Sequence, residues 1–247
     1  MRRFTFAPDR LAGGRVTFDR AETHHLARVL RLGPGDTVLA SSGDGFDHTV
    51  RLETIGETAT GVVIATRTRA AESALSITLV QGIPKGDTME SIVRATTELG
   101  VARIVPAITE RTVVRLDPSR WRERARRWQR VAKEATKQCG RAVVPEIEVP
   151  RPLVECLAAC GDATPGELSL CVWEGATARL GGVLDRAAGV TRACVLVGPE
   201  GGLSVAEVEA ARARAFVVAS LGPRILRAET AGPTVLSILQ FRLGDVS

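Results

Sequence analysis

The C-terminal region, residues 193–243, constrains the fold of this 247-residue chain more than any other stretch. Two short apolar runs, residues 193–197 and 216–221, each end in a loop with glycine and proline, and each loop leads into a helical pattern. A short apolar run that ends in glycine is typical of a buried parallel strand. Ligands of open α/β sheets bind outside the carboxyl ends of the strands. We therefore expect the two loops, residues 198–202 and 221–230, to line one site.

Residues 73–247 alternate predicted strands and helices, which indicates a mostly parallel α/β sheet. Asp87 with Glu90, and Ser204 with Glu207, have the spacing of capping boxes at helix starts. The predicted strands cover residues 75–81, 101–107, 146–149, 168–173, 193–197 and 216–221, and the helices between them cover residues 87–99, 118–139, 153–159 and 176–188.

Residues 1–72 have a different pattern, with few apolar residues, frequent glycines and short alternating stretches. One short helix is expected at residues 21–30, with Leu26, Val29 and Leu30 on the same face. Short alternating runs between glycine-rich turns are typical of strands. This part of the chain is therefore predicted to be a small β-barrel-like domain, with strands at residues 37–40, 47–55 and 60–65.

The net charge of +5 is concentrated in one segment, because residues 111–141 carry 11 basic and only 3 acidic side chains. A charge run of this kind is either a solvated helix face or a contact surface for a polyanion. Arginine makes up 30 of the 33 basic residues and suits bidentate phosphate contacts. We expect RNA or DNA phosphates to contact this helix, while Trp121 and Trp128 pack in the core.

Five cysteines without a C-x-x-C pair argue against a disulfide framework or a zinc site and favour reduced thiols in the cytosol. Cys171 and Cys194 lie in apolar runs and are expected in the core. The adjacent His24 and His25 have no third ligand at a suitable spacing, so no metal is expected. The chain has neither an apolar run of transmembrane length nor an N-terminal apolar signal segment, which indicates a cytoplasmic protein.

The sequence GPEGG at residues 198–202, here called the GPEGG loop, lacks the G-x-G-x-x-G and G-K-[ST] patterns, so neither NAD nor ATP is favoured. Its charged residue, Glu200, either hydrogen-bonds local backbone or contacts a ligand. In the second loop, Ile225 and Leu226 either pack inward or cover a flat apolar ligand such as an adenine ring. Arg227 and Glu229 flank them, and Thr230 can cap the last helix.

The motifs GPEGGLS and LGPRILRAETA together resemble the C-terminal signature of the SPOUT methyltransferases. More narrowly, the chain resembles the family that methylates N3 of a uridine in small-subunit ribosomal RNA (RsmE-type). Three further blocks resemble that family in the same order, so the resemblance covers nearly the whole chain: HHLARVLRLGPGD, KGDTMESIVRATTELGV and RWQRVAKEATKQCGRAVVPEI. One departure is Gly232-Pro233 in the last helix, because proline is tolerated only in a first helical turn.

The resemblance implies a PUA-like RNA-binding β-barrel domain over residues 1–72 and a SPOUT domain with a trefoil knot over residues 73–247. It also implies S-adenosylmethionine as cofactor, a homodimer, and 16S ribosomal RNA, within the small subunit, as substrate. Two other readings stay open: a SPOUT enzyme for another RNA, such as one that methylates ribose 2′-oxygens of transfer RNA, and a non-catalytic RNA-binding protein.

The resemblance also assigns residues. Arg227 is expected to hold the deprotonated uracil, or else to contact phosphate, and Glu229 and Thr230 to orient it. The cofactor is expected to contact Glu174, Val197, Gly198, Pro199, Glu200, Gly201, Leu221, Gly222, Ile225 and Leu226. RNA is expected to contact Arg2, Arg3, His25, Arg28, Arg31, Arg124 and Arg127.

Overall fold

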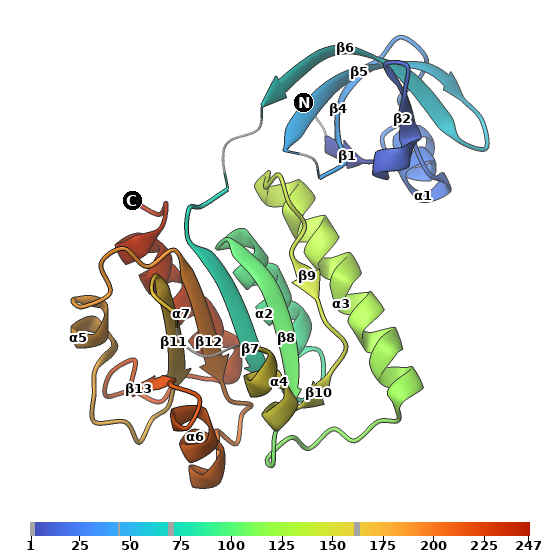
Figure 1. Cartoon of the computed structure of the whole chain (residues 1–247). Coiled ribbons are helices and arrows are strands. Elements are labelled where there is room, and N and C mark those ends of the chain that lie inside the picture. Colours follow the sequence, from blue (N-terminus) through green and yellow to red (C-terminus); the bar gives the residue numbers. More distant parts are fainter. Residues whose placement is uncertain (1–2, 44, 69–71, 161–163) are drawn as a thin grey trace. The chain divides into compact units, whose positions relative to one another are not determined.

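The computed structural model describes residues 3–43, 45–68, 72–160 and 164–247. The chain divides into two compact units (Figure 1). The smaller unit contains Met1–Glu72 and Thr136–Val144, and the larger unit contains Ser73–Ala135 and Pro145–Ser247. The long helix α3 (Pro118–Cys139) therefore supplies its last residues to the smaller unit, a return of the chain that the sequence pattern did not indicate.

The smaller unit is built on a curved six-stranded sheet with the order β1-β4-β5-β6-β3-β2 (Figure 1). β1 and β4 are parallel, and the other neighbouring pairs are antiparallel. The strands are β1 (Arg3–Thr5), β2 (Leu11–Ala12), β3 (Arg15–Thr17), β4 (Thr37–Ser41), β5 (Phe46–Ile55) and β6 (Ala59–Thr68), with a 3-10 turn η1 (Pro8–Arg10) before β2.

Buried apolar side chains form the core of this unit, including Phe4, Phe18 and Leu52. The predicted helix at residues 21–30 is α1 (Arg20–His24) followed by one π-type turn, η2 (His25–Val29). The wider turn changes the helical spacing, so Leu26 is buried while Val29 is 61% exposed. Leu30 packs against the same core as Leu26, so the expectation that Leu26, Val29 and Leu30 share one face was wrong for Val29 alone.

The larger unit contains a seven-stranded parallel sheet, in which β9 pairs with β8 beside the main order β10-β8-β7-β12-β11-β13. Each long strand is an apolar run buried on both faces, as the sequence predicted. The strands are β7 (Ser76–Gly82), β8 (Val101–Ile108), β9 (Glu146–Ile147), β10 (Arg151–Pro152), β11 (Glu167–Val172), β12 (Arg192–Val197) and β13 (Val217–Ala219).

Helices cover both faces of this sheet (Figure 1). α2 (Thr88–Glu98) and α7 (Ala228–Leu243) pack on one face, and α4 (Leu153–Ala159) and α6 (Val205–Arg212) on the other. The helix predicted over residues 176–188 is only α5 (Leu180–Leu184). Two neighbouring glycines, at 181 and 182, have low helix propensity and lie in this short element.

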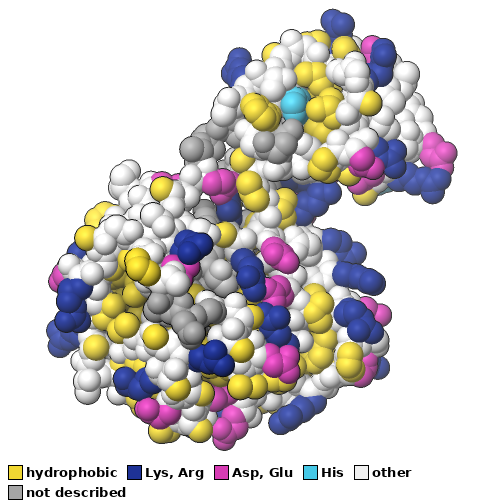
Figure 2. Space-filling model, in the orientation of Figure 1, with side chains coloured by type: hydrophobic (Ala, Val, Ile, Leu, Met, Phe, Trp, Pro, Cys, Tyr) yellow, Lys and Arg dark blue, Asp and Glu magenta, His cyan; other side chains and the backbone are white. Residues whose placement is uncertain are grey.

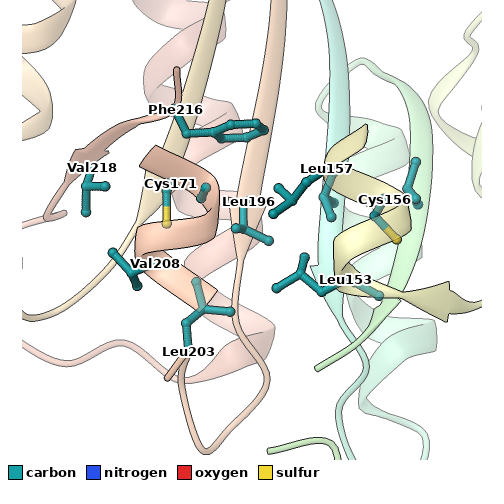
Figure 3. Packing of buried hydrophobic residues seen from close by; sticks show 13 residues of the cluster. Leu153, Cys156, Leu157, Cys171, Leu196, Leu203, Val208, Phe216 and Val218 are labelled. Carbon is teal, nitrogen blue, oxygen red and sulfur yellow. The ribbon is translucent and has the colours of Figure 1, made fainter. Parts of the chain in front are cut away.

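The core beneath α4 and α6 is shown in Figure 3, where Leu153 and Leu157 of α4 lie on one side of Leu196. Val208 of α6 and Phe216, just before β13, lie on its other side. These side chains are at most 5% exposed. The core therefore fixes β12 in the sheet immediately before the GPEGG loop.

The helix starts agree with the predicted caps in part. Ser204 and Glu207 form the expected capping box, with reciprocal side-chain-to-backbone hydrogen bonds of 3.3 and 2.9 Å. Asp87 makes no side-chain cap, so that prediction was wrong. The carboxylate of Glu90, its expected partner, forms an ion pair with Arg127 of α3 instead.

α7 continues through Gly232 and Pro233. Pro233 is the sixth residue of this helix, beyond the first turn in which proline is normally tolerated. Its ring nitrogen cannot donate the usual hydrogen bond to the carbonyl of Glu229. The Ser237 hydroxyl donates to the Pro233 carbonyl at 2.9 Å. The expected departure in this helix is therefore local.

Candidate functional site

A cavity of about 360 Å³ lies at the carboxyl ends of β11, β12 and β13. It is the place where the carboxyl ends of parallel strands direct their loops to one edge of the sheet. The expectation that the two C-terminal loops line one site is confirmed. The lining residues are Val172, Trp173, Glu174, Val197, Gly198, Pro199, Glu200, Gly201, Gly202, Leu203, Ser220, Leu221, Gly222, Pro223, Arg224, Ile225, Leu226, Ala228 and Ala231.

The GPEGG loop is held by hydrogen bonds from distant parts of the larger unit. The Gln81 Nε2 donates to the Gly198 carbonyl at 3.2 Å, and the Arg111 Nη1 donates to the Gly201 carbonyl at 2.6 Å. The Lys85 backbone N–H donates to the Glu200 Oε1 at 2.9 Å. The Glu200 carboxylate thus accepts from backbone 115 residues away in the chain and not, within the described residues, from the local backbone that one of the two expectations named.

Glycine is required in the GPEGG loop because backbone atoms crowd there. A Cβ at Gly198 would lie 2.9 Å from the carbonyl carbon of Gly202, closer than real Cβ contacts allow. Gly202 has a φ of +70°, which favours glycine, and a Cβ there would lie 3.0 Å from the Glu174 Oε1. Glu174 therefore lies against the loop and lines the cavity.

The other side of the cavity is formed by the PRILR loop, residues 223–227, between β13 and α7. Ile225 is 83% exposed and Leu226 is half-buried, and both line the cavity. An isoleucine this exposed is not packed in the core of the unit, so the expectation that Ile225 packs inward was wrong.

The three proposed catalytic residues lie at the start of α7, and the cavity lining does not include them. Arg227 is the N-cap residue, and its side chain is 87% exposed. Its guanidinium lies 3.9 Å from the Glu229 carboxylate. Thr230 is exposed and donates its backbone N–H to the Arg227 carbonyl at 2.9 Å. The expectation that Thr230 caps this helix was wrong, because the helix begins two residues earlier, at Ala228.

Sequence reasoning missed several lining residues, which are Val172, Trp173, Leu203, Ser220, Ala228 and Ala231. Ala228 and Ala231 are three residues apart on the first turn of α7 and are buried. Two small residues at this spacing allow a helix face to approach a ligand closely. The spacing of the two alanines can be read from the sequence, but only the structure shows that they line the same cavity as the PRILR loop.

Basic side chains of α3 form a second concave region, of about 780 Å³, here called the α3 groove. Figure 2 shows Lys and Arg side chains, with a few acidic ones, along the edge of the larger unit where α3 lies. Arg124 is half-buried, and Arg127 forms ion pairs with Asp87 and Glu90. The groove is lined by Leu116, Arg120, Glu123, Arg124, Arg126, Arg127 and Arg130. Trp121 and Trp128 are buried, as predicted.

The remaining predicted RNA contacts belong to the smaller unit. Arg28 and Arg31 are exposed. Arg3 forms an ion pair with Asp47 at 3.1 Å, and the His25 ring packs against Phe4 with centroids 5.5 Å apart. Arg2 lies outside the described residues.

The cysteines are free thiols, and the described residues contain no group of three metal-binding side chains. Cys171 is buried, whereas Cys194 is half-buried beside Cys160, with the two sulfurs 2.8 Å apart. Burial raises the pKa of the Cys171 thiol to about 12. Among the described residues, no helix is long and apolar enough to cross a membrane.

Comparison with known proteins identifies both parts of the chain. Residues 71–240 match the model of the RNA methyltransferase domain, and residues 18–63 match that of the RNA methyltransferase PUA domain. The curated proteins named ribosomal RNA small subunit methyltransferase E from Bacillus subtilis and Synechocystis are 31% and 36% identical. These matches cover 90% and 94% of this chain and 88% and 75% of the relatives.

Two solved structures extend this likeness to the whole chain. The ribosomal RNA small subunit methyltransferase E of Neisseria gonorrhoeae, bound to S-adenosylmethionine, is 32% identical, with a TM-score of 0.88 and complete coverage of both chains. A methyltransferase of Legionella pneumophila in complex with the same cofactor is 30% identical, with a TM-score of 0.90, over 99% of this chain and 98% of the other.

The predicted fold class, a SPOUT-type parallel α/β domain preceded by a PUA-type domain with a curved sheet, is confirmed. The trefoil knot stays a prediction. The chain belongs to the RNA methyltransferase family, in the group of ribosomal RNA small subunit methyltransferase E proteins.

Proposed function

We propose that this protein uses S-adenosylmethionine to methylate N3 of a uridine in 16S ribosomal RNA. The observation that carries the proposal is the cavity at the ends of β11, β12 and β13, formed by the GPEGG and PRILR loops. It lies in a chain whose fold matches, over its full length, a relative bound to this cofactor. Methylation of this RNA would take place in the cytoplasm, where small subunits are assembled.

The residues of the cavity fit such a cofactor. Backbone from four glycines and apolar side chains such as Leu203 and Leu226 can enclose an adenosine group. The carboxylate of Glu174, which lines the cavity, favours a positively charged sulfonium nearby. When bound, the cofactor supplies an activated methyl group for in-line displacement. The protein's task is then to align the nucleophile and exclude water.

Uracil N3 carries a proton at neutral pH, so this proton must pass to a general base or to water before the N–C bond is complete, and the uracil anion that forms must be stabilised. We assign the second task to Arg227, whose exposed guanidinium can donate to one of the carbonyl oxygens beside N3 and so stabilise the uracil anion while N3 stays open to the methyl group. Glu229, 3.9 Å away, orients this guanidinium, and Thr230 lies one residue further on the same exposed turn.

RNA binding is assigned to basic side chains on each unit. Arg124 and Arg127 in the α3 groove, and Arg28 and Arg31 in the smaller unit, are placed to contact phosphates. Arg127 must exchange its ion pairs with Asp87 and Glu90 for a phosphate contact, so its net contribution should be smaller than that of Arg124.

We also propose that the enzyme acts as a homodimer. Ile225 and Phe241 are large apolar side chains that are 83% and 65% exposed, and both are encoded by the same C-terminal region as the cavity. Exposed apolar residues of this size favour association. Sedimentation should give twice the mass of the chain, and a monomer at all working concentrations would contradict the proposal.

The function is tested by incubating the protein with S-adenosylmethionine and either naked 16S RNA or isolated small subunits, followed by mass analysis of the nucleosides. We expect N3-methyluridine, and the preferred substrate separates naked RNA from the assembled subunit. Ribose-methylated nucleosides would indicate a different methyltransferase. Failure to bind S-adenosylmethionine in a titration would instead indicate a non-catalytic RNA-binding protein.

A further inference from the structure

A fully buried glutamine, Gln81, lies directly behind the cavity at the end of β7. β7 pairs with β12 so that Gln81 is opposite Val197, the last residue before the GPEGG loop. Its Nε2 donates to two carbonyls, that of Gly82 at 3.0 Å and that of Gly198 at 3.2 Å. This amide orientation is required, because the opposite one would direct Oε1 at two acceptor oxygens.

The other end of the same amide faces α7. Gln81 Oε1 is buried and has no hydrogen-bond partner among the described residues. A Cβ added at Gly232 of α7 would lie 3.3 Å from it. The neighbouring residue on this helix, Ala231, lines the cavity. Gln81 therefore lies between the GPEGG loop and the helix that forms another wall of the site.

Two glycines, Gly82 and Gly232, leave space for the chain segments that pack around Gln81. A Cβ at Gly82 would lie 2.5 Å from the Cδ and 2.6 Å from the backbone nitrogen of Pro199 in the GPEGG loop. Gly82 thus lets the loop pass directly over the end of β7, and Gly232 lets α7 approach Gln81. A buried hydrogen-bond acceptor without a partner lowers the stability of a protein, so such atoms are rare. Their presence indicates that the side chain is needed for another purpose.

We propose that Gln81 is a positioning residue for the cofactor site, which fixes the Gly198 carbonyl, and that Gly232 provides the space it needs. The inference rests on the proposed function, since it takes the cavity as the S-adenosylmethionine site. Without the Gln81 amide, the Gly198 carbonyl is free to rotate, and the turn closed by the bond from Gly202 N–H to the Pro199 carbonyl, 2.9 Å, loses its anchor.

The test compares two fully buried glutamines. Gln81→Met keeps the length of the side chain and removes the amide. Gln240→Met does the same near the far end of α7, where the Ser73 hydroxyl donates to Gln240 Oε1 at 2.7 Å and the Nε2 has no partner in the described chain. We measure the Kd of S-adenosylmethionine by calorimetry, KM and kcat by methyl transfer, and the melting temperature.

We expect Gln81→Met to raise the Kd and KM of the cofactor about five- to tenfold, because the buried hydrogen bond to the Gly198 carbonyl is lost, with kcat changed less than threefold. Gln240→Met should change the melting temperature but leave the Kd within twofold. Equal cofactor affinity in wild type and Gln81→Met, or equal weakening in both variants, would overturn the positioning role. Absence of binding by the wild type would overturn the proposed function itself.

A second pair keeps the inference testable if Gln81→Met does not fold. Gly232→Ala places a methyl group against Gln81, whereas Gly182→Ala adds one in α5 where nothing lies within 4 Å. We expect Gly232→Ala to weaken cofactor binding about threefold or more and Gly182→Ala to leave it unchanged. Unchanged binding in Gly232→Ala would show that the site does not depend on this contact.

Discussion

The GPEGG loop and the PRILR loop line the same cavity but are held in different ways. The GPEGG loop accepts hydrogen bonds from the side chains of Gln81 and Arg111 and from the backbone of Lys85. In the PRILR loop, by contrast, the side chains of Ile225 and Arg227 are more than 80% exposed. A loop fixed before binding suits a cofactor of constant shape. A more exposed loop suits a large substrate that arrives separately and completes the site. We infer that the GPEGG loop is the fixed part of the cofactor site, whereas the PRILR loop completes that site through Leu226 and carries the RNA chemistry at Arg227.

The largest expected effect comes from the exposed loop. Arg227→Ala should lower kcat at least a hundredfold, because a charged donor to the reacting base is lost, while the Kd of S-adenosylmethionine stays within threefold. Arg224→Ala, in the same loop, is the matched control and should lose much less turnover. Methyl transfer at the wild-type rate by Arg227→Ala would remove the role assigned to this residue.

The next largest effect is expected on the Kd of the cofactor when a side chain is added in the GPEGG loop. Gly198→Ala should raise the Kd of the cofactor about tenfold or more, because its Cβ would lie 2.9 Å from backbone. A Cβ added at Gly222 would lie within 4 Å of no other atom, but the backbone there has a φ of +125°. Gly222→Ala should therefore lower the free energy of unfolding by about 1–2 kcal/mol through local backbone strain and change the Kd less than Gly198→Ala does. If calorimetry showed that Gly222→Ala raises the Kd of the cofactor more than Gly198→Ala does, the two loops would not differ in this way.

A smaller effect is expected from one tie of the GPEGG loop. Arg111→Ala removes the 2.6 Å hydrogen bond to the Gly201 carbonyl and should weaken cofactor binding about threefold. Arg115→Ala, an exposed arginine on the same connection, serves as the control and should have no effect. Identical affinities for both variants would mean that Arg111 does not hold the loop.

The smallest effect concerns stability. Ile225→Ala should change the free energy of unfolding by less than about 0.5 kcal/mol, because the side chain is 83% exposed. Leu203→Ala, next to the GPEGG loop and 2% exposed, should cost about 2–5 kcal/mol. Denaturant unfolding measures both values. A large loss for Ile225→Ala would show that the PRILR loop is packed rather than open.

The difference between the loops also explains what the sequence could reveal. Glycine-rich turns after apolar strands are local patterns, so the GPEGG loop and the capping box of Ser204 were predictable. The hydrogen bonds that hold the GPEGG loop come from residues about 90 to 117 positions away in the chain. They could not be predicted, because a single glutamine or arginine leaves no periodic signal in the sequence. The cap assigned to Asp87 was wrong because its expected partner, Glu90, binds Arg127 of α3, a tertiary contact.

Mass analysis of small-subunit ribosomal RNA tests the central claim most directly. The RNA is prepared from a strain that lacks this gene and from the same strain supplied with the wild-type protein or with Arg227→Ala. We predict that N3-methyluridine disappears on deletion, returns with the wild type and stays absent with Arg227→Ala. An unchanged level of N3-methyluridine in the deletion strain would contradict the account.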